Sequence, residues 1–144
     1  MNIGILGAGN IAGSMARTIC GMAAQGRPVT LYAVASRSQE KADAFAKAYG
    51  IPRAYGSYAA MLNDPLVELV YIATPHSHHA EQIRQCVAAG KPVLCEKSFT
   101  ANAKQAEDVL REAEAAGVYV AEAIWTRYMP ARGMIADIIA SGEI

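Results

Sequence analysis

Residues 1–13 read MNIGILGAGNIAG, and this stretch decides the fold. Asn2–Leu6 is short, apolar and strand-like, and the pattern Gly-x-Gly-x-x-Ala runs directly after it from Gly7. Such a turn between a strand and a helix is typical of dinucleotide-binding βαβ units. Gly7 would form the tight turn, Gly9 would let the backbone approach a pyrophosphate, and Ala12 would allow close helix–strand packing. The alternative is a glycine turn that binds no ligand.

Short apolar runs alternate with helical patterns along the rest of the chain. The expected strands are Asn2–Leu6, Val29–Ala35, Ile51–Ala54, Val67–Ala73, Pro92–Cys95 and Val118–Ala123. The expected helices are Ile11–Ala24, Gln39–Tyr49, Tyr58–Leu62, His79–Ala89, Asn102–Ala116 and Tyr128–Ser141. Apolar strands that alternate with helices predict right-handed crossovers and a parallel sheet. We therefore expect an α/β fold, a doubly wound parallel Rossmann sheet with strand order 3-2-1-4-5-6.

The composition excludes several classes of protein. The chain has 144 residues, of which 53% are hydrophobic and 18% charged, and this excludes intrinsic disorder. Lys+Arg and Asp+Glu both number 13, so the basic excess typical of a nucleic-acid or membrane-surface binder is not present. No apolar run reaches the roughly 18 residues of a membrane span, and the N-terminus does not resemble a signal peptide. Cys20, Cys86 and Cys95 have no metal-site spacing and are expected to be buried free thiols in a cytoplasmic protein.

The residues after the second strand bear on the choice of cofactor. An acidic side chain at this position would accept a hydrogen bond from the 2′-hydroxyl of NAD, but Ser36-Arg37 stands there, with Lys41 one turn further on. Arginine attracts a 2′-phosphate and stacks on an adenine. We expect NADP(H) to be the preferred cofactor, with NAD(H) possible. The alternative is that Arg37 is a solvated surface residue without a cofactor preference.

All three histidines of the chain lie in one segment after the fourth strand, Thr74–His79. A metal site is not expected there, because no cysteine or carboxylate has a suitable spacing and neighbouring histidines on a starting helix point in different directions. We expect one or two of these histidines to line a nicotinamide pocket, and His78 to be structural or exposed.

Two further groups follow the fifth and sixth strands. Glu96-Lys97 ends the fifth strand, where an ammonium could orient a substrate hydroxyl or lower the pKa of a neighbouring acid. The alternative for Lys97 is an ordinary solvated lysine. Trp125 follows the sixth strand and is expected either to form a wall of the substrate site or to pack in the core.

These motifs resemble, in order and spacing, the N-terminal half of the glucose–fructose oxidoreductase, inositol dehydrogenase and MocA family. The motifs that carry the resemblance are Gly7-x-Gly9-x-x-Ala12, Ala35-Ser36-Arg37, Ala73-Thr74-Pro75-His76-x-x-His79 and Glu96-Lys97. The segment from Glu122 to Pro130 is similar more specifically to a diol dehydrogenase branch of the family. The resemblance implies reversible hydride transfer between NADP(H) and a sugar-like or diol carbon.

The resemblance also implies roles for individual residues. Lys97 would be the catalytic residue and would contact the nicotinamide ribose and the substrate hydroxyl. The pyrophosphate would lie on Gly7, Gly9, Asn10 and Ile11, the 2′-phosphate on Ser36 and Arg37, and the ribose and nicotinamide along Thr74, Pro75, His79, Glu96 and Lys97. Trp125 and His76 are expected to contact substrate, and no metal ion is expected.

The chain departs from the family pattern in two ways. The proline that follows the family's lysine is Ser98 here, so we expect no cis peptide at this bond. Family members are also longer, so residues 1–124 are expected to form the dinucleotide-binding domain and residues 125–144 a linker or helix leading to a missing C-terminal substrate domain. That domain would supply the proton-transferring residue, most substrate contacts and a homo-oligomer interface.

Three functional hypotheses remain. The first is the NADP(H)-binding domain of an oxidoreductase that acts on a small-molecule sugar or diol, with little turnover by the chain alone because the acid–base partner is absent. The second is a non-catalytic regulatory module that binds NADP(H). The third is the domain of an NAD-dependent inositol-type dehydrogenase, against which Ser36-Arg37 argues.

Overall fold

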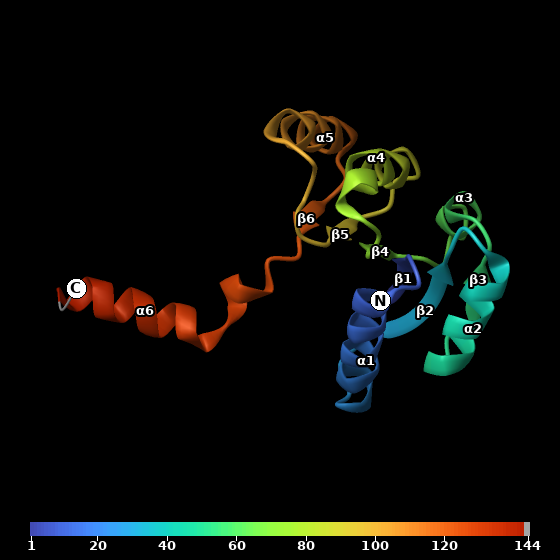
Figure 1. Cartoon of the computed structure of the whole chain (residues 1–144), viewed down its shortest axis with the longest axis horizontal. Helices are drawn as coiled ribbons and strands as arrows, with labels where there is room; N and C mark the ends of the chain where they lie inside the picture. Colours follow the sequence, from blue (N-terminus) through green and yellow to red (C-terminus); the bar gives the residue numbers. More distant parts are fainter. Residues whose placement is uncertain (143–144) are drawn as a thin grey trace.

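A parallel sheet forms the centre of the computed structural model, which describes residues 1–142 of the chain (Figure 1). The strands are β1 (Asn2–Leu6), β2 (Thr30–Ala35), β3 (Arg53–Tyr55), β4 (Leu69–Ile72), β5 (Val93–Cys95) and β6 (Val120–Glu122). Their order is β3-β2-β1-β4-β5-β6, and all five neighbouring pairs are parallel. The predicted doubly wound Rossmann topology is therefore confirmed.

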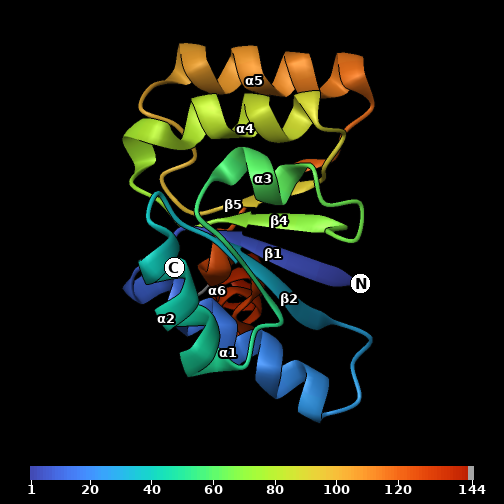
Figure 2. The same ribbon diagram turned by 90° about the vertical axis from the view of Figure 1, so that its right-hand side faces the viewer.

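Helices cover both faces of the sheet (Figure 2). They are α1 (Asn10–Ala24), α2 (Gln39–Tyr49), α3 (Tyr58–Leu62), α4 (His79–Ala88) and α5 (Ala103–Ala116). The chain also forms helix α6 (Pro130–Ser141), which does not cover the sheet, and the short 3₁₀ helices η1 (His76–His78) and η2 (Trp125–Tyr128). One apolar core lies on the α3–α5 side and includes Met61, Ile83 and Val109. The other lies on the α1–α2 side and includes Ile19 and Ala46.

Local hydrogen bonds explain why two strands differ from their predicted bounds. Strand β4 begins at Leu69 instead of Val67, because the Val67 N–H donates to the Asp64 carbonyl in a turn. Strand β3 begins at Arg53 instead of Ile51, because the Ile51 N–H is used to close the end of helix α2. Alternating apolar runs locate a strand well, but such turn contacts decide where it starts.

A row of backbone hydrogen bonds joins the carboxyl ends of all the strands. The bonds run from Ser36 N to Tyr55 O (3.0 Å), Gly7 N to Ala35 O (2.8 Å), Ala73 N to Leu6 O (2.9 Å), Glu96 N to Ile72 O (3.0 Å) and Ala123 N to Cys95 O (2.7 Å). Each bond continues the pairing of two strands by one residue beyond the strand itself. The turns that follow the strands are thereby brought to one edge of the sheet, which we call the carboxyl edge.

The segment after β6 leaves the sheet, and α6 projects away from it (Figure 1). Apolar side chains on α6 are exposed, among them Met134, Ile135, Ile138 and Ile139. Within residues 1–142, no helix is both long and apolar enough to cross a membrane. Glu143 and Ile144, the last residues of the predicted 125–144 linker, lie outside the described residues.

The three cysteines are free, but they are not all buried as expected. Cys86 and Cys95 are buried, and burial raises the pKa of the Cys86 thiol to about 12. Cys20 is exposed on helix α1, because its position falls on the solvent side of the helix, next to buried Ile19.

Asp64, in the loop after α3, joins this loop to the strands β2 and β3. Its Oδ2 accepts hydrogen bonds from the Tyr55 hydroxyl (2.6 Å) and the Tyr32 hydroxyl (3.1 Å), and its Oδ1 accepts one from the Leu66 N–H (2.8 Å). The bond from Tyr55 is the largest cause that lowers the pKa of Asp64 below its ordinary value of 3.8. This contact fixes the loop on one side of α3, the helix that carries Tyr58.

We predict that Asp64→Asn lowers the free energy of unfolding by about 1 kcal/mol at pH 7, because an ionised acceptor is replaced by a neutral one. The pKa of Asp64 is lower in the folded than in the unfolded state, so its stabilising contribution is present above the ordinary value of 3.8 and is lost as the pH falls through the folded-state pKa. Urea unfolding at pH 7 and pH 3 measures both effects. Asp137→Asn, on the exposed face of α6, is the matched control and should change neither. An equal difference from wild type at both pH values would contradict the prediction.

Candidate functional site

Two glycines in the turn after β1 serve different purposes. Gly7 has a φ of 104°, and a Cβ added there would lie 2.9 Å from the Ala73 carbonyl oxygen, so a side chain does not fit. A Cβ added at Gly9 would meet nothing within 4 Å. The first glycine is therefore required by the turn itself, whereas the second keeps an open surface on its outer side.

Helix α1 begins directly after this turn and presents an uncapped end. Gly9 is its N-cap and supplies no side-chain cap, and the first turn contains no acidic residue. The N–H groups of a first helical turn lack partners within the helix, and the helix dipole places partial positive charge there. Asn10 and Ile11 are exposed at this end. The geometry suits an anion.

A shallow pocket of about 200 Å³ connects the turns after β1, β2 and β4. Its lining includes Gly7, Gly9, Ser36, Arg37, Lys41, Tyr58, Thr74 and Pro75. The structure thus brings together residues that the sequence analysis selected from three separate motifs. Ser36 is buried at the end of β2, while Arg37 and Lys41 are exposed and place two cationic side chains at the same pocket.

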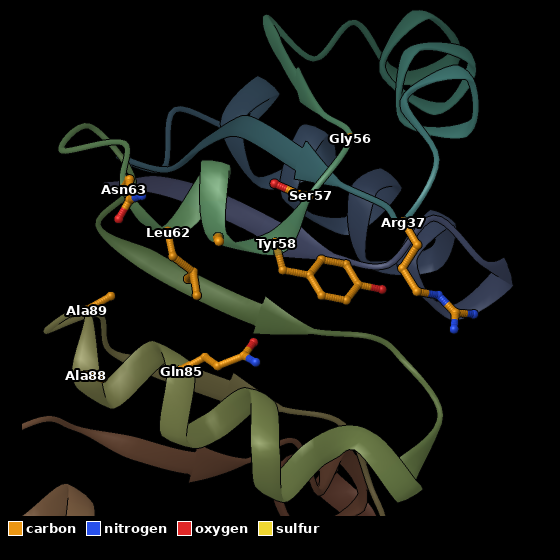
Figure 3. A pocket seen from close by; sticks show the side chains of 10 residues that line it. Arg37, Gly56, Ser57, Tyr58, Leu62, Asn63, Gln85, Ala88 and Ala89 are labelled. Atoms are coloured by element: carbon orange, nitrogen blue, oxygen red, sulfur yellow. The ribbon is translucent and has the colours of Figure 1, made fainter.

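Tyr58 is a lining residue that the sequence analysis did not select. It is the first residue of α3, directly after Ser57, whose hydroxyl caps the helix by accepting from the Ala60 N–H at 3.2 Å. Tyr58 also lines a larger pocket of about 700 Å³ between α3 and α4, together with Arg37 and Gln85 (Figure 3). Figure 3 shows its ring extending toward Arg37. In the sequence, the signal that could have identified Tyr58 is an aromatic residue just beyond the carboxyl end of β3.

The turn from Glu96 to Phe99 follows β5, and neighbouring elements hold it at several points. The Tyr71 hydroxyl, on β4, donates to Glu96 Oε1. Glu96 Oε2 accepts from the Lys97 N–H at 3.1 Å, and the Phe99 N–H donates to Glu122 Oε1 at 2.8 Å. The side chain of Lys97 is exposed at the carboxyl edge. The turn therefore presents an ammonium from a fixed backbone.

The expectation that Ser98 excludes a cis peptide is wrong, because the Lys97–Ser98 bond is cis. A proline ring is not needed to define the backbone here, since the segment is bound through the Ser98 carbonyl and the Phe99 N–H. The sequence alone did not show these contacts.

Burial raises the pKa of the Tyr71 hydroxyl, and its hydrogen bond to Glu96 raises it further. Tyr71 therefore stays protonated at neutral pH and acts as a donor. This fixes one carboxylate oxygen of Glu96 and orients the other toward the Lys97 backbone.

The side chain of His79, a residue expected along the ribose and nicotinamide, is completely buried at the start of α4. Its Nδ1 lies 2.9 Å from the Ser98 carbonyl oxygen and its Nε2 lies 2.9 Å from the Thr74 carbonyl oxygen. The ring therefore faces the protein and not the open edge where a nicotinamide would bind. The other two histidines, His76 and His78, are exposed on η1. Across residues 1–142, no three His, Cys, Asp or Glu side chains are grouped as a metal ion would require.

Trp125 is 63% exposed, which excludes packing in the core. It lines an open apolar groove of about 380 Å³ on the side of β4–β6 that faces α1, together with Met15, Leu94 and Tyr128. Glu96 also lines this groove and connects it with the Lys97 turn. A ligand in the groove would therefore lie next to that turn.

The parallel sheet, the glycine turn and the pocket at the carboxyl edge define a Rossmann domain of the dinucleotide-binding class. Residues 1–124 match the family model for the oxidoreductase family with an NAD-binding Rossmann fold, GFO_IDH_MocA. The chain belongs to this Gfo/Idh/MocA oxidoreductase family.

Named relatives agree with this assignment. Trans-1,2-dihydrobenzene-1,2-diol dehydrogenase of Mus musculus is 39% identical over 141 residues, which are 98% of this chain and 42% of the relative. D-xylose 1-dehydrogenase (NADP(+)) of Hypocrea jecorina is 38% identical over 98% of this chain and 38% of its own length. The chain thus spans about two fifths of the length of these curated relatives.

Solved structures share the fold at comparable coverage. A 3-ketoreductase from Actinomadura kijaniata, in complex with TDP-benzene and NADP, superimposes with a TM-score of 0.90 at 29% identity, over 100% of this chain and 44% of that structure. An NAD binding oxidoreductase from Klebsiella pneumoniae gives a TM-score of 0.87 at 33% identity, over 100% and 39%.

We predict that Gly7→Ala lowers the free energy of unfolding by about 1–3 kcal/mol, because the positive φ and the Ala73 carbonyl oppose a side chain. Gly9→Ala should cost less than about 1 kcal/mol, since its Cβ enters open space. Urea unfolding of both variants beside wild type measures the difference. Equal losses, or a larger loss for Gly9→Ala, would contradict the assigned roles.

Proposed function

We propose that the chain is the NADP(H)-binding domain of an oxidoreductase that transfers a hydride between the nicotinamide and a sugar-like or diol substrate. The observation that carries the proposal is the arrangement of the carboxyl edge, where the glycine turn follows β1, two cationic side chains follow β2 and the Lys97 turn follows β5. Relatives of similar sequence are dehydrogenases of a diol and of a sugar.

The glycine turn fits a pyrophosphate. The open surface outside Gly9 leaves room for an anion next to the backbone, and the first N–H groups of α1 are suited to donate to it. Asn10 and Ile11 place their N–H groups at this end of the helix. The same residues would hold the pyrophosphate of NADP(H) or of NAD(H), so this part of the site does not distinguish the two.

The end of β2 supports NADP(H). Arg37 and Lys41 line the pocket beside buried Ser36, and the lining residues described there include no carboxylate. Two cations in a pocket lining without a carboxylate favour a 2′-phosphate, which a guanidinium binds through two N–H donors. The planar groups of Arg37 and Tyr58 provide surfaces on which an adenine would stack. The neighbour from Actinomadura kijaniata is a complex with NADP.

Lys97 would act on the substrate. When bound, the nicotinamide supplies or accepts the hydride. The Lys97 ammonium would donate a hydrogen bond to the reacting oxygen of the substrate, holding it in place and stabilising negative charge on it. Glu96, held by Tyr71, would keep the turn in position, and the groove lined by Trp125 would receive the rest of the substrate. The chain spans about two fifths of its curated relatives, and we expect little turnover from this part alone.

We predict that Arg37→Gln raises the dissociation constant of NADPH by about 10–100-fold, because it removes charge-assisted hydrogen bonds to the 2′-phosphate. The same variant should weaken the binding of NADH by less than about fivefold, since NADH lacks that phosphate and loses only the stacking of its adenine on Arg37. Calorimetric titration of the pure chain with each nucleotide measures both constants. Arg132→Gln, an exposed arginine on α6, is the matched control. Tighter binding of NADH than of NADPH by wild type would refute the cofactor assignment.

A further inference from the structure

His79 joins two segments that lie far apart in the sequence. Its Nε2 approaches the Thr74 carbonyl oxygen, just after β4, and its Nδ1 approaches the Ser98 carbonyl oxygen in the turn after β5, both at 2.9 Å. The first segment contributes to the pocket beside the glycine turn, and the second presents Lys97. The ring therefore lies between the two parts of the site without reaching the surface.

Helix α4 holds the Thr74 segment at two points. Besides His79, the buried side chain of Gln82, one turn further along α4, accepts a hydrogen bond from the Thr74 hydroxyl. Both the backbone carbonyl and the side chain of Thr74 thus contact residues of helix α4. Any displacement of this segment would act on the ring of His79 directly.

The Lys97 turn has contacts with three elements, from Tyr71 on β4, His79 on α4 and Glu122 on β6. Among these three side chains, His79 contacts the Thr74 segment as well. A rigid imidazole with nitrogens on opposite sides can donate to at least one carbonyl and, when both nitrogens are protonated, to each. A displacement of one carbonyl is therefore passed to the other through this ring more directly than through a flexible side chain of the same length.

We propose that His79 is a positioning residue that sets the Lys97 turn relative to the Thr74-Pro75 segment, so that nucleotide bound at this segment is sensed at Lys97. This inference rests on the proposed function. His79 itself touches neither nucleotide nor substrate, because its side chain is buried.

The test compares wild type, His79→Gln and His78→Gln as full chains. His78 is the matched control because it is the exposed neighbour of His79. NMR follows the side-chain methylene signals of Lys97, assigned with Lys97→Arg, before and after NADPH is added, and calorimetry gives the affinity. In His79→Gln we expect the Lys97 signals to move in the free chain, their response to NADPH to fall by about half, and the dissociation constant to rise about tenfold. His78→Gln should match wild type.

A measurement on wild type keeps the proposal testable if His79→Gln does not fold. The ring N–H of His79 should exchange with water at least about 100-fold more slowly than those of His76 and His78, and its signals should move when NADPH binds. A buried ring with a merely structural role would be protected, but it would not respond to nucleotide.

The outcomes separate the two proposals. A wild-type chain that binds no NADPH would refute the proposed function, and the Lys97 signals of the free variants would still test the contact across His79. A folded His79→Gln with wild-type NADPH affinity and unchanged Lys97 signals would overturn the positioning role. Wild-type ring signals of His79 that stay fixed on nucleotide binding would overturn it as well.

Discussion

The structure depends on the row of hydrogen bonds that joins the carboxyl ends of the strands. Each bond links the residue after one strand to the last residue of its neighbour, as Gly7 N to Ala35 O and Glu96 N to Ile72 O illustrate. Parallel pairing alone sets the direction of the strands, but these bonds also bring the ends into line. The functional residues follow strand ends that are far apart in sequence, and they meet because the ends are aligned.

Much of this arrangement could be predicted from the sequence, because it follows from local patterns. The alternation of apolar runs and helical periodicity indicated every strand, and the spacing from Gly7 to Ala12 indicated the turn and the helix after it. The order of the strands was predicted because six strands with five crossovers fit the doubly wound dinucleotide-binding fold. The same rules predict that Arg37 and Lys97 lie at one edge of the sheet.

The remaining features depend on contacts between distant residues, which local patterns do not reveal. His79 looked like a ligand-facing residue because it lies in the segment that leaves β4, yet its partner Ser98 is 19 residues away and draws the ring inward. The cis bond before Ser98 went unpredicted because the turn is fixed by neighbouring elements and not by its own sequence. Tyr58 was overlooked because α3 is short, and only its position beside Arg37 gives the ring a role.

The proposed function divides the work between rigid and exposed parts of the carboxyl edge. Buried groups such as Tyr71 and His79 fix the backbone, whereas Arg37 and Lys97 extend from it toward ligands. The chain covers about two fifths of the length of its curated relatives. The role proposed for it is therefore to bind the nucleotide.

A backbone ¹H–¹⁵N NMR titration of the chain with NADPH tests the central claim most directly, because it reports where the nucleotide binds. We expect shifts at the carboxyl edge, at Gly7–Asn10, Ser36-Arg37, Thr74 and Glu96–Ser98, with the amino ends of the strands unchanged. Shifts confined to the amino ends, or none at saturating nucleotide, would contradict it.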